Sequence, residues 1–166
     1  MKWIAISGGW RIINSQVEDD VRKTIREIIS QGNGIVSGGA QGVDYIATEE
    51  ALKNGCGKDH LKIIIPSTLE IYKDHYLKRA KEGVLTYERA EKLITQLTEV
   101  KKRGCLEEGK DIIIENPTYF RRIEKIINKA DELIAFHINN TEGTQYTIDK
   151  AKGKGIPVKI HNYQIK

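Results

Sequence analysis

The sequence of 166 residues contains little cysteine and no long apolar run. Its two cysteines, Cys56 and Cys105, lie far apart, which leaves neither a metal-binding C-x-x-C pair nor a disulfide framework. No stretch approaches the roughly 18 consecutive apolar residues that span a membrane. Residues 1–4 lead into a predicted strand instead of a signal peptide. We therefore expect a cytoplasmic protein with two inert thiols and no membrane partner.

A strong excess of charge of one sign is missing as well. The chain has 27 Lys and Arg against 23 Asp and Glu, which gives a formal net charge of +4. Residues 1–83 hold 12 basic and 11 acidic side chains, and residues 84–166 hold 15 and 12. Proteins that bind nucleic acid mainly through charge usually cluster their Lys and Arg residues. The even spread along this chain permits a nucleic-acid partner without indicating one.

Common metal and nucleotide motifs are also missing. The four histidines, His60, His75, His137 and His161, form neither an H-x-x-x-H nor an H-E-x-x-H pattern. The sequence has no Walker A motif, G-x-x-x-x-G-K-[ST], and no G-x-G-x-x-G dinucleotide fingerprint. We expect neither a metal site nor a cofactor.

Short isoleucine-rich runs alternate with amphipathic stretches along the chain. Runs that are apolar at nearly every position are typical of parallel strands covered by helices on both faces. Strands are predicted at residues 4–6, 34–36, 61–65, 132–137 and 158–160. Helices are predicted after residue 15, at about 43–54, after residue 69, at 86–103, from 116 and at about 144–152. This alternation predicts an α/β fold, a Rossmann-like doubly wound parallel sheet with helices on both faces.

The first predicted helix has the clearest boundaries. Ser15 stands three residues before Glu18, as in a capping box, and Gly32 follows the last apolar position as a stop signal. Residues 67–116 are too many for one simple crossover, so we expect a helical insertion there. The length of the chain predicts that this insertion lies within a single domain of residues 1–166.

Two glycine-rich loops follow the first two predicted strands. They read Ser7-Gly8-Gly9 and Ser37-Gly38-Gly39-Ala40-Gln41-Gly42. In an open α/β sheet, ligands bind beyond the carboxyl ends of the strands, where helix N-termini favour anions. Glycine lets backbone N–H groups approach a phosphate closely, and serine hydroxyls add donors. The loops therefore predict a phosphate-bearing ligand, although tight turns also use glycine for geometry alone.

A third polar loop, residues 139–147, follows the later strand and contains Thr141. Gly143 and Thr144 are expected to open a helix here, so that a backbone N–H group and a hydroxyl face the ligand, unless Thr144 only caps the helix. Arg11 and Arg122 are the favoured cations, because a guanidinium group presents a planar fork of donors to a phosphate.

The same residues carry a family resemblance. Residues 35–44 read Ile-Val-Ser-Gly-Gly-Ala-Gln-Gly-Val-Asp, and Arg122 stands nine residues before Asp131, ahead of a strand and a Gly-Thr turn. These segments resemble the SLOG superfamily, which unites the DNA-processing protein DprA (Smf) with the LOG-type phosphoribohydrolases. The nearest branch is DprA, whose pattern is [IV]-[IV]-S-G-[GL]-A-x-G-[IV]-D. The resemblance implies a Rossmann-type fold with a nucleotide-type pocket.

The resemblance also implies roles for single residues. Asp44 would hydrogen-bond a ribose hydroxyl or organise the glycine loop, or it only stabilises a helix N-terminus. The LOG hydrolases carry P-G-G-x-G-T-x-x-E, whereas this chain lacks P-G-G and has Thr147 at the glutamate position. We therefore lean against an enzyme, with Glu142 as the fallback catalytic group. Relatives commonly associate, so we also expect a homo-oligomer.

The predicted function is binding or sensing of a nucleotide or another phosphate-bearing small molecule across the three loops. DprA-like binding of single-stranded DNA and LOG-like cleavage of an N-glycosidic bond stay open as alternatives. The predicted binding residues are Ser7, Gly8, Gly9, Arg11, Ser37, Gly38, Gly39, Ala40, Gly42, Asp44, Arg122, Thr141, Gly143 and Thr144.

Overall fold

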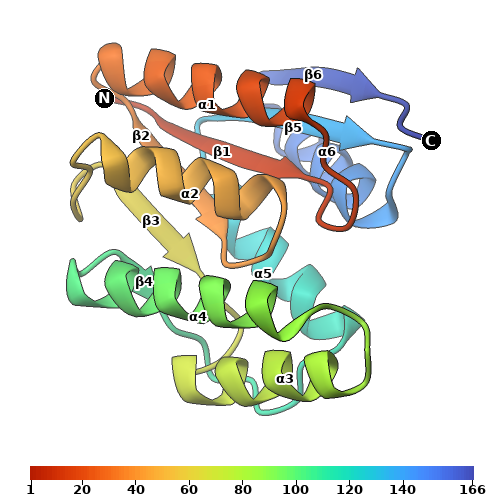
Figure 1. Cartoon of the computed structure of the whole chain (residues 1–166). Helices are drawn as coiled ribbons and strands as arrows, with labels where there is room; N and C mark the ends of the chain where they lie inside the picture. Colours follow the sequence, from red (N-terminus) through yellow and green to blue (C-terminus); the bar gives the residue numbers. More distant parts are fainter.

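The computed structural model describes residues 1–166 as one parallel sheet with helices on both faces (Figure 1). The strands are β1 (Trp3–Gly8), β2 (Gly34–Gly38), β3 (Leu61–Ile64), β4 (Leu106–Glu107), β5 (Glu132–Ile138) and β6 (Val158–Tyr163). The helices are α1 (Ser15–Ser30), α2 (Val43–Lys53), α3 (Leu69–Lys81), α4 (Tyr87–Lys102), α5 (Asn116–Lys129) and α6 (Glu142–Lys154). The predicted α/β, Rossmann-like, doubly wound fold is confirmed.

The strand order is β4-β3-β2-β1-β5-β6, and every pairing is parallel. The chain therefore starts in the middle of the sheet, builds outward through β4 and returns to place β5 on the other side of β1. The switch point between β1 and β5 is where ligands bind in sheets of this kind.

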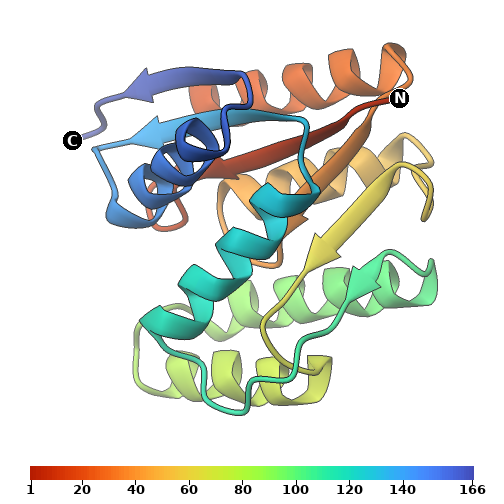
Figure 2. The ribbon, with the colours of Figure 1, turned by 180° about the vertical axis from the view of Figure 1, so that it is seen from behind.

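The strands read as unbroken apolar runs because helices cover both of their faces. Ile4 and Ile6 of β1 point into the larger core, which α1, α2, α3 and α4 cover. Ala5 points the other way, into a smaller core under α5 and α6. Figure 2 shows α5 and α6 on the face opposite α1 and α2. None of these helices combines the length and apolar composition needed to cross a membrane.

Residues 67–116 differ from the predicted helical insertion. They contain α3 and α4, but also β4, which pairs with β3 through Ile63 opposite Leu106 and Ile64 opposite Glu107. The sheet thus has one more strand than the sequence predicts. Two residues, of which Glu107 is exposed, are too few to give a recognisable strand pattern.

Several predicted element ends are wrong. Asn14, not Ser15, caps α1, because its side chain accepts a hydrogen bond from the Val17 N–H at 2.9 Å. Helix α6 begins at Glu142, so Thr144 lies inside its first turn and neither opens nor caps the helix. Strand β6 runs on to Tyr163, past the predicted end at residue 160.

The two cysteines fit their predicted inert character. Cys56 and Cys105 are both buried and free. Burial raises the pKa of each thiol, so the reactive thiolate is disfavoured at neutral pH.

Candidate functional site

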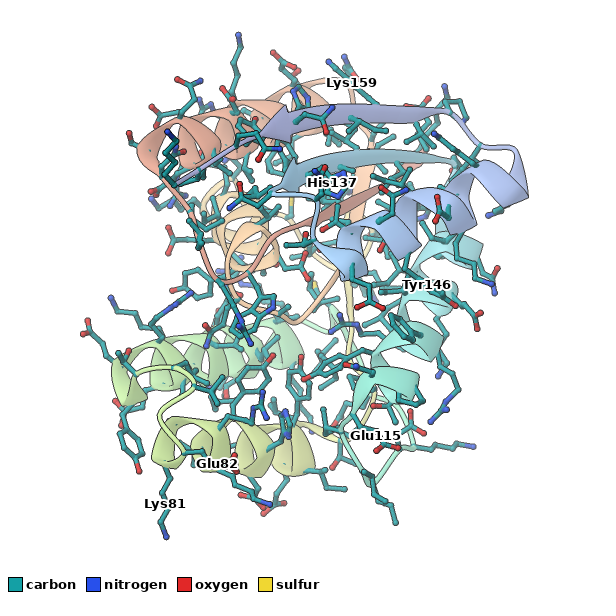
Figure 3. The ribbon with its side chains drawn as sticks, turned by 90° about the vertical axis from the view of Figure 1, so that its right-hand side faces the viewer. Lys81, Glu82, Glu115, His137, Tyr146 and Lys159 are labelled. Atoms are coloured by element: carbon teal, nitrogen blue, oxygen red, sulfur yellow. The ribbon has the colours of Figure 1, made fainter.

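The three polar loops meet at the carboxyl edge of the sheet, around a cavity of about 680 Å³. Figure 3 looks onto this edge, with Glu82 after the end of α3, Glu115 at the start of α5 and His137 on β5. The cavity is walled by the ends of β1, β2 and β5 and by residues of α3 and α5. It therefore lies at the topological switch point, on the carboxyl edge of the sheet where the sequence predicts the ligand.

Direct backbone contact joins the first two loops. The Val43 N–H donates to the Gly9 carbonyl at 3.0 Å. Gly42 has a φ of +72°, and a Cβ atom there would collide with the Gly9 carbonyl oxygen and with Trp10. Only glycine meets both the positive φ and the close approach, so Gly42 fixes how the two loops sit together.

Gly38 leaves room for two charged side chains. A Cβ atom at this position would lie 2.9 Å from the guanidinium carbon of Arg122 and 3.1 Å from Asp44 Oδ2. Arg122, on α5, and Asp44, on α2, therefore both approach the end of β2 from opposite faces of the sheet. Both side chains line the cavity.

Arg122 is the most unusual group in the cavity. Its side chain is only 8% exposed, and no carboxylate lies within the 4.0 Å of an ion pair. The guanidinium group lies 5.1 Å above the ring of Tyr119 and donates from Nη1 to the Tyr72 hydroxyl at 3.4 Å, while Nε has no partner. Asp44 is close enough to interact with this charge but lies outside ion-pair distance, so the buried cation is only partly compensated and the arrangement favours an anionic ligand in the cavity.

Two tyrosines of α3 fix the position of Arg122. The Tyr72 hydroxyl donates to the Gly39 carbonyl at 3.0 Å and accepts from Arg122. Its single hydrogen is thereby used, so the Tyr76 hydroxyl, 3.3 Å away, donates to it. Burial raises the pKa of both tyrosines, which keeps these hydroxyls protonated. The second loop, α3 and α5 are joined through this network.

Asp44 is buried beside this network and is only 8% exposed. Burial raises its pKa to about 6, although the charge of Arg122 and hydrogen bonds from Ser37 and the Ala40 N–H act in the opposite direction. The Ser37 hydroxyl lies 3.0 Å from Asp44 Oδ1 and 3.0 Å from the Ile6 carbonyl oxygen. Asp44 is therefore a carboxyl group that changes charge just below neutral pH.

The rim of the cavity is aromatic, apolar and basic. The Arg11 guanidinium lies 4.5 Å above the Trp10 ring, and Arg89 of α4 donates to the Trp10 carbonyl at 3.0 Å. Ile12 and Val84 line the cavity from two sides and are 46% and 37% exposed. Exposed ring and aliphatic surface beside arginines is suited to a nucleobase and its phosphate.

The third loop contributes the first turn of α6. Thr141, Gly143 and Thr144 line the cavity, and the Thr141 hydroxyl donates to the Thr144 hydroxyl at 3.2 Å. Free N–H groups at the first turn of a helix favour an anion. Glu142 is exposed in the same turn, and the buried Thr147 donates to the Gly143 carbonyl at 2.9 Å.

Most of the predicted binding residues share this cavity, and their role in binding stays a prediction. Ser37, Gly39 and Gly42 do not line it, for three physical reasons. The Ser37 hydroxyl is used inside the protein, Gly42 supports the loop contact, and a Cβ on Gly39 would collide with Ile65 in the core. The predicted binding residues that do line the cavity are Ser7, Gly8, Gly9, Arg11, Gly38, Ala40, Asp44, Arg122, Thr141, Gly143 and Thr144.

Sequence reasoning predicted only part of the wall that α3 and α5 provide: the aromatic residues 72–76 indicate packing onto a helix more than a pocket cover, and Arg122 is the one predicted binding residue of α5. His75, Tyr76, Arg79 and Tyr119 line the cavity, and the Tyr119 hydroxyl lies 3.2 Å from His75 Nε2. Burial lowers the pKa of His75, and the neighbouring Arg79 adds to this effect. No group of His, Cys, Asp and Glu in the structure is arranged to hold a metal ion.

Known proteins share this fold. The chain is similar to DNA processing protein A from Helicobacter pylori, described by its single-stranded DNA binding mode, with a TM-score of 0.70 and 23% identity over 96% of this chain and 64% of that one. It is also similar to DprA from Streptococcus pneumoniae, with a TM-score of 0.64 and 20% identity over 96% of this chain and 50% of that one. The chain thus spans less than two thirds of each. No curated protein matches it at the level of sequence.

A family match extends over almost the whole sequence. The model for DNA recombination-mediator protein A matches residues 2–165, which include all three loops and the three arginines of the cavity, Arg11, Arg79 and Arg122. The match agrees with the resemblance of residues 35–44 to the DprA pattern and with the likeness of the folds. The chain belongs to the DNA recombination-mediator protein A family.

Proposed function

We propose that the chain binds single-stranded DNA through the cavity at the carboxyl edge of the sheet. The observation that carries the proposal is Arg122, a buried guanidinium group that lines the cavity and forms no direct ion pair with a carboxylate. A phosphate of the DNA supplies the direct ion pair that Arg122 lacks. Family membership and the described DNA binding of the Helicobacter pylori relative support the same partner.

The surroundings of Arg122 suit a strand whose bases are unstacked. Residues of the glycine loops and of the first turn of α6 line the same cavity, and backbone N–H groups in such loops and helix starts are donors for phosphate oxygens. Trp10, Tyr119 and Phe120 supply ring surface at its wall. Stacking of bases on aromatic side chains needs free base faces, which a duplex does not offer. We therefore expect a preference for single strands over duplexes.

Fluorescence anisotropy with a labelled oligothymidylate of about twelve nucleotides tests this proposal. We expect Arg122→Gln to weaken binding by at least about tenfold, because a charge-assisted contact to phosphate is lost. Arg103→Gln is the matched control, since Arg103 is exposed at the C-cap of α4 and pairs with Glu99 at 3.0 Å. Circular dichroism and thermal unfolding show whether each variant is folded.

Two results would overturn the proposal. The first is no binding of single-stranded DNA by the unaltered protein at low salt, where phosphate contacts are strongest. The second is a folded Arg122→Gln variant that binds as tightly as the unaltered protein.

A nucleotide or other phosphate-bearing small molecule is a second candidate ligand. The cavity volume of about 680 Å³ falls within the range of small-molecule sites. Calorimetry against nucleoside mono-, di- and triphosphates and cyclic nucleotides tests it, and no heat of binding across the panel would remove it. No observation favours hydrolysis, because Thr147 stands at the glutamate position of the hydrolases. Self-association stays a prediction.

A further inference from the structure

The helices on the two faces of the sheet carry opposite charge. Helices α1 and α2 together contain seven Asp or Glu and four Lys or Arg. Helices α5 and α6 contain seven Lys or Arg and three Asp or Glu. These pairs lie on opposite faces of the sheet (Figures 1 and 2). An anion that approaches the α5 side therefore meets the more positive surface.

The exposed face of α5 has a basic residue at every fourth position. Arg121, Lys125 and Lys129 are all exposed, and four residues of a helix rise about 6 Å, so the three form a row along its axis. Arg121 pairs with Asp111 at 3.0 Å, and the Lys129 ammonium lies 5.0 Å above the Trp3 ring. Lys125 and Lys129 take part in no ion pair. We call these three residues the α5 row.

Negative groups beside the α5 row are neutralised within the protein. Glu124 is bonded to Lys150 at 3.1 Å and to the Tyr146 hydroxyl at 3.0 Å, and these hydrogen bonds lower its pKa. The Lys154 ammonium donates to three carbonyls at and beyond the end of α5, at 2.8, 2.9 and 2.8 Å. Those carbonyls form the negative end of the helix dipole. Glu124 and the carbonyls at the end of α5 are therefore compensated, and the acidic groups without an ion pair, Glu115 and Asp131, lie outside the helix, before its start and after its end.

The α5 row lies on the outer face of the helix whose buried face lines the cavity as far as Ile126. Tyr119 and Arg122, in the first half of α5, line the cavity, and Arg121 directly precedes Arg122. Figure 2 shows α5 running from the carboxyl edge back across the face of the sheet. A strand held at Arg122 therefore meets Arg121, Lys125 and Lys129 if it leaves the cavity over the outer face of α5.

We propose that single-stranded DNA held in the cavity continues along the outer face of α5, with successive phosphates beside Arg121, Lys125 and Lys129. The inference rests on the proposed function and adds a second contact surface outside the cavity. A single strand fits this surface because one row of cations meets one row of phosphates. Such contacts carry no sequence preference, since they address only the backbone.

The test compares two lengths of oligothymidylate, about four and about twelve nucleotides, by fluorescence anisotropy at several salt concentrations. The variant carries Lys125→Ala and Lys129→Ala, which removes two charges from exposed helix positions and keeps helix propensity. The control carries Lys23→Ala and Lys102→Ala, two exposed lysines of α1 and α4 on the other side of the molecule.

We expect the variant to bind the short strand within about twofold of the unaltered protein and the long strand about fivefold to tenfold more weakly. Its salt slope on the long strand should fall by about 1.4, which corresponds to two lost phosphate contacts. The proposal that DNA follows the α5 row would be overturned if the variant and the unaltered protein bound the long strand with equal affinity. It would also be overturned if the control lost as much affinity as the variant. If the unaltered protein bound neither length, the proposed function itself would fail.

Discussion

The two helical layers of this protein use charge in different ways. Between α1 and α2, Arg22 pairs with Glu18 at 2.8 Å and with Glu49 at 2.7 Å, and the buried Glu50 accepts from Arg26 at 2.8 Å. These charges satisfy one another and hold two helices together. On the opposite face, Lys125 and Lys129 take part in no ion pair, and Arg122 has Asp44 nearby but outside ion-pair distance. The difference shows which charges stabilise the fold and which are available to a ligand.

A net charge of +4 gives no hint of this division. The signs are almost balanced in each half of the sequence, because loops and the charged faces of α3 and α4 dilute the contrast. The topology places the acidic and the basic helices on different faces of the sheet. Helices α1 and α2 come before β3 and pack on one face, whereas α5 and α6 flank β5 and pack on the other. The difference in charge between the two faces of the sheet thus arises from the fold and cannot be read from the composition.

The largest effect is expected where the loops leading into α1 and α2 touch. Gly42→Ala places a Cβ against the Gly9 carbonyl at a φ of +72°, so it should lower the free energy of unfolding by about 3 kcal/mol. Gly55→Ala is the matched control, because Gly55 has a φ of +78° with no atom within 4 Å, and it should cost only about 1 kcal/mol. Urea unfolding measures both, and equal losses would contradict the loop contact.

A smaller loss of stability is expected when the ion pairs between α1 and α2, the more acidic helical layer, are removed. Glu50→Gln should lower the free energy of unfolding by about 2 kcal/mol, because Arg22 and Arg26 lose a buried partner. Glu88→Gln, which removes an exposed pair with Lys92 at 3.1 Å, should change it by less than about 0.5 kcal/mol. Neither variant should alter DNA affinity by more than about twofold. A large loss of DNA binding in Glu50→Gln would show that this layer is not purely structural.

The smallest effect concerns Asp44, an acid of α2 that reaches into the basic cavity. Its pKa of about 6 means that it carries charge at pH 7.5 and is largely neutral at pH 5. Loss of that charge beside Arg122 should strengthen DNA binding about threefold to fivefold as the pH falls through 6. Asp44→Asn should bind more tightly at pH 7.5 and lose most of this pH dependence. An identical pH profile in variant and unaltered protein would contradict it.

The same pKa fixes the sign of the effect of Asp44 on stability. The folded-state pKa lies above the ordinary value of 3.8, so the folded protein binds this proton more tightly than the unfolded chain. The contribution of Asp44 to stability therefore grows as the pH falls through 6 and is lost as the pH rises above it. Urea unfolding at pH 5 and 7.5 should show a larger difference for the unaltered protein than for Asp44→Asn.

Much of the fold could be predicted because its signals are local. The isoleucine runs of β1 to β3 and the helical period of α1 and α5 depend only on neighbouring residues, and so do the glycine loops. Strand β4 was not predicted, because two residues are too few to show the alternation of apolar and polar side chains that marks a strand. The predicted N-cap of α1 was Ser15 and the observed one is Asn14. Both residue types are good N-caps, and the sequence does not show which of two neighbours takes the role.

The site was less predictable because its walls come together only through packing. His75, Tyr76 and Tyr119 reach the cavity through contacts between α3 and α5 that no local pattern reports. Helical spacing does separate the two adjacent arginines of α5: Arg122 stands four residues before the buried Ile126, whereas Arg121 stands four before the exposed Lys125. The four-residue spacing to an apolar residue thus predicts from the sequence alone that Arg122 points inward.

The most direct measurement of the central claim is a titration of ¹⁵N-labelled protein with an oligothymidylate of about twelve nucleotides, followed by amide NMR shifts. We expect the shifts to concentrate at residues 7–12, 116–129 and 141–147 and to leave the outer faces of α1 and α2 unchanged. Shifts concentrated on α1 and α2, or no shifts at low salt, would contradict the claim that the basic face and its cavity bind single-stranded DNA.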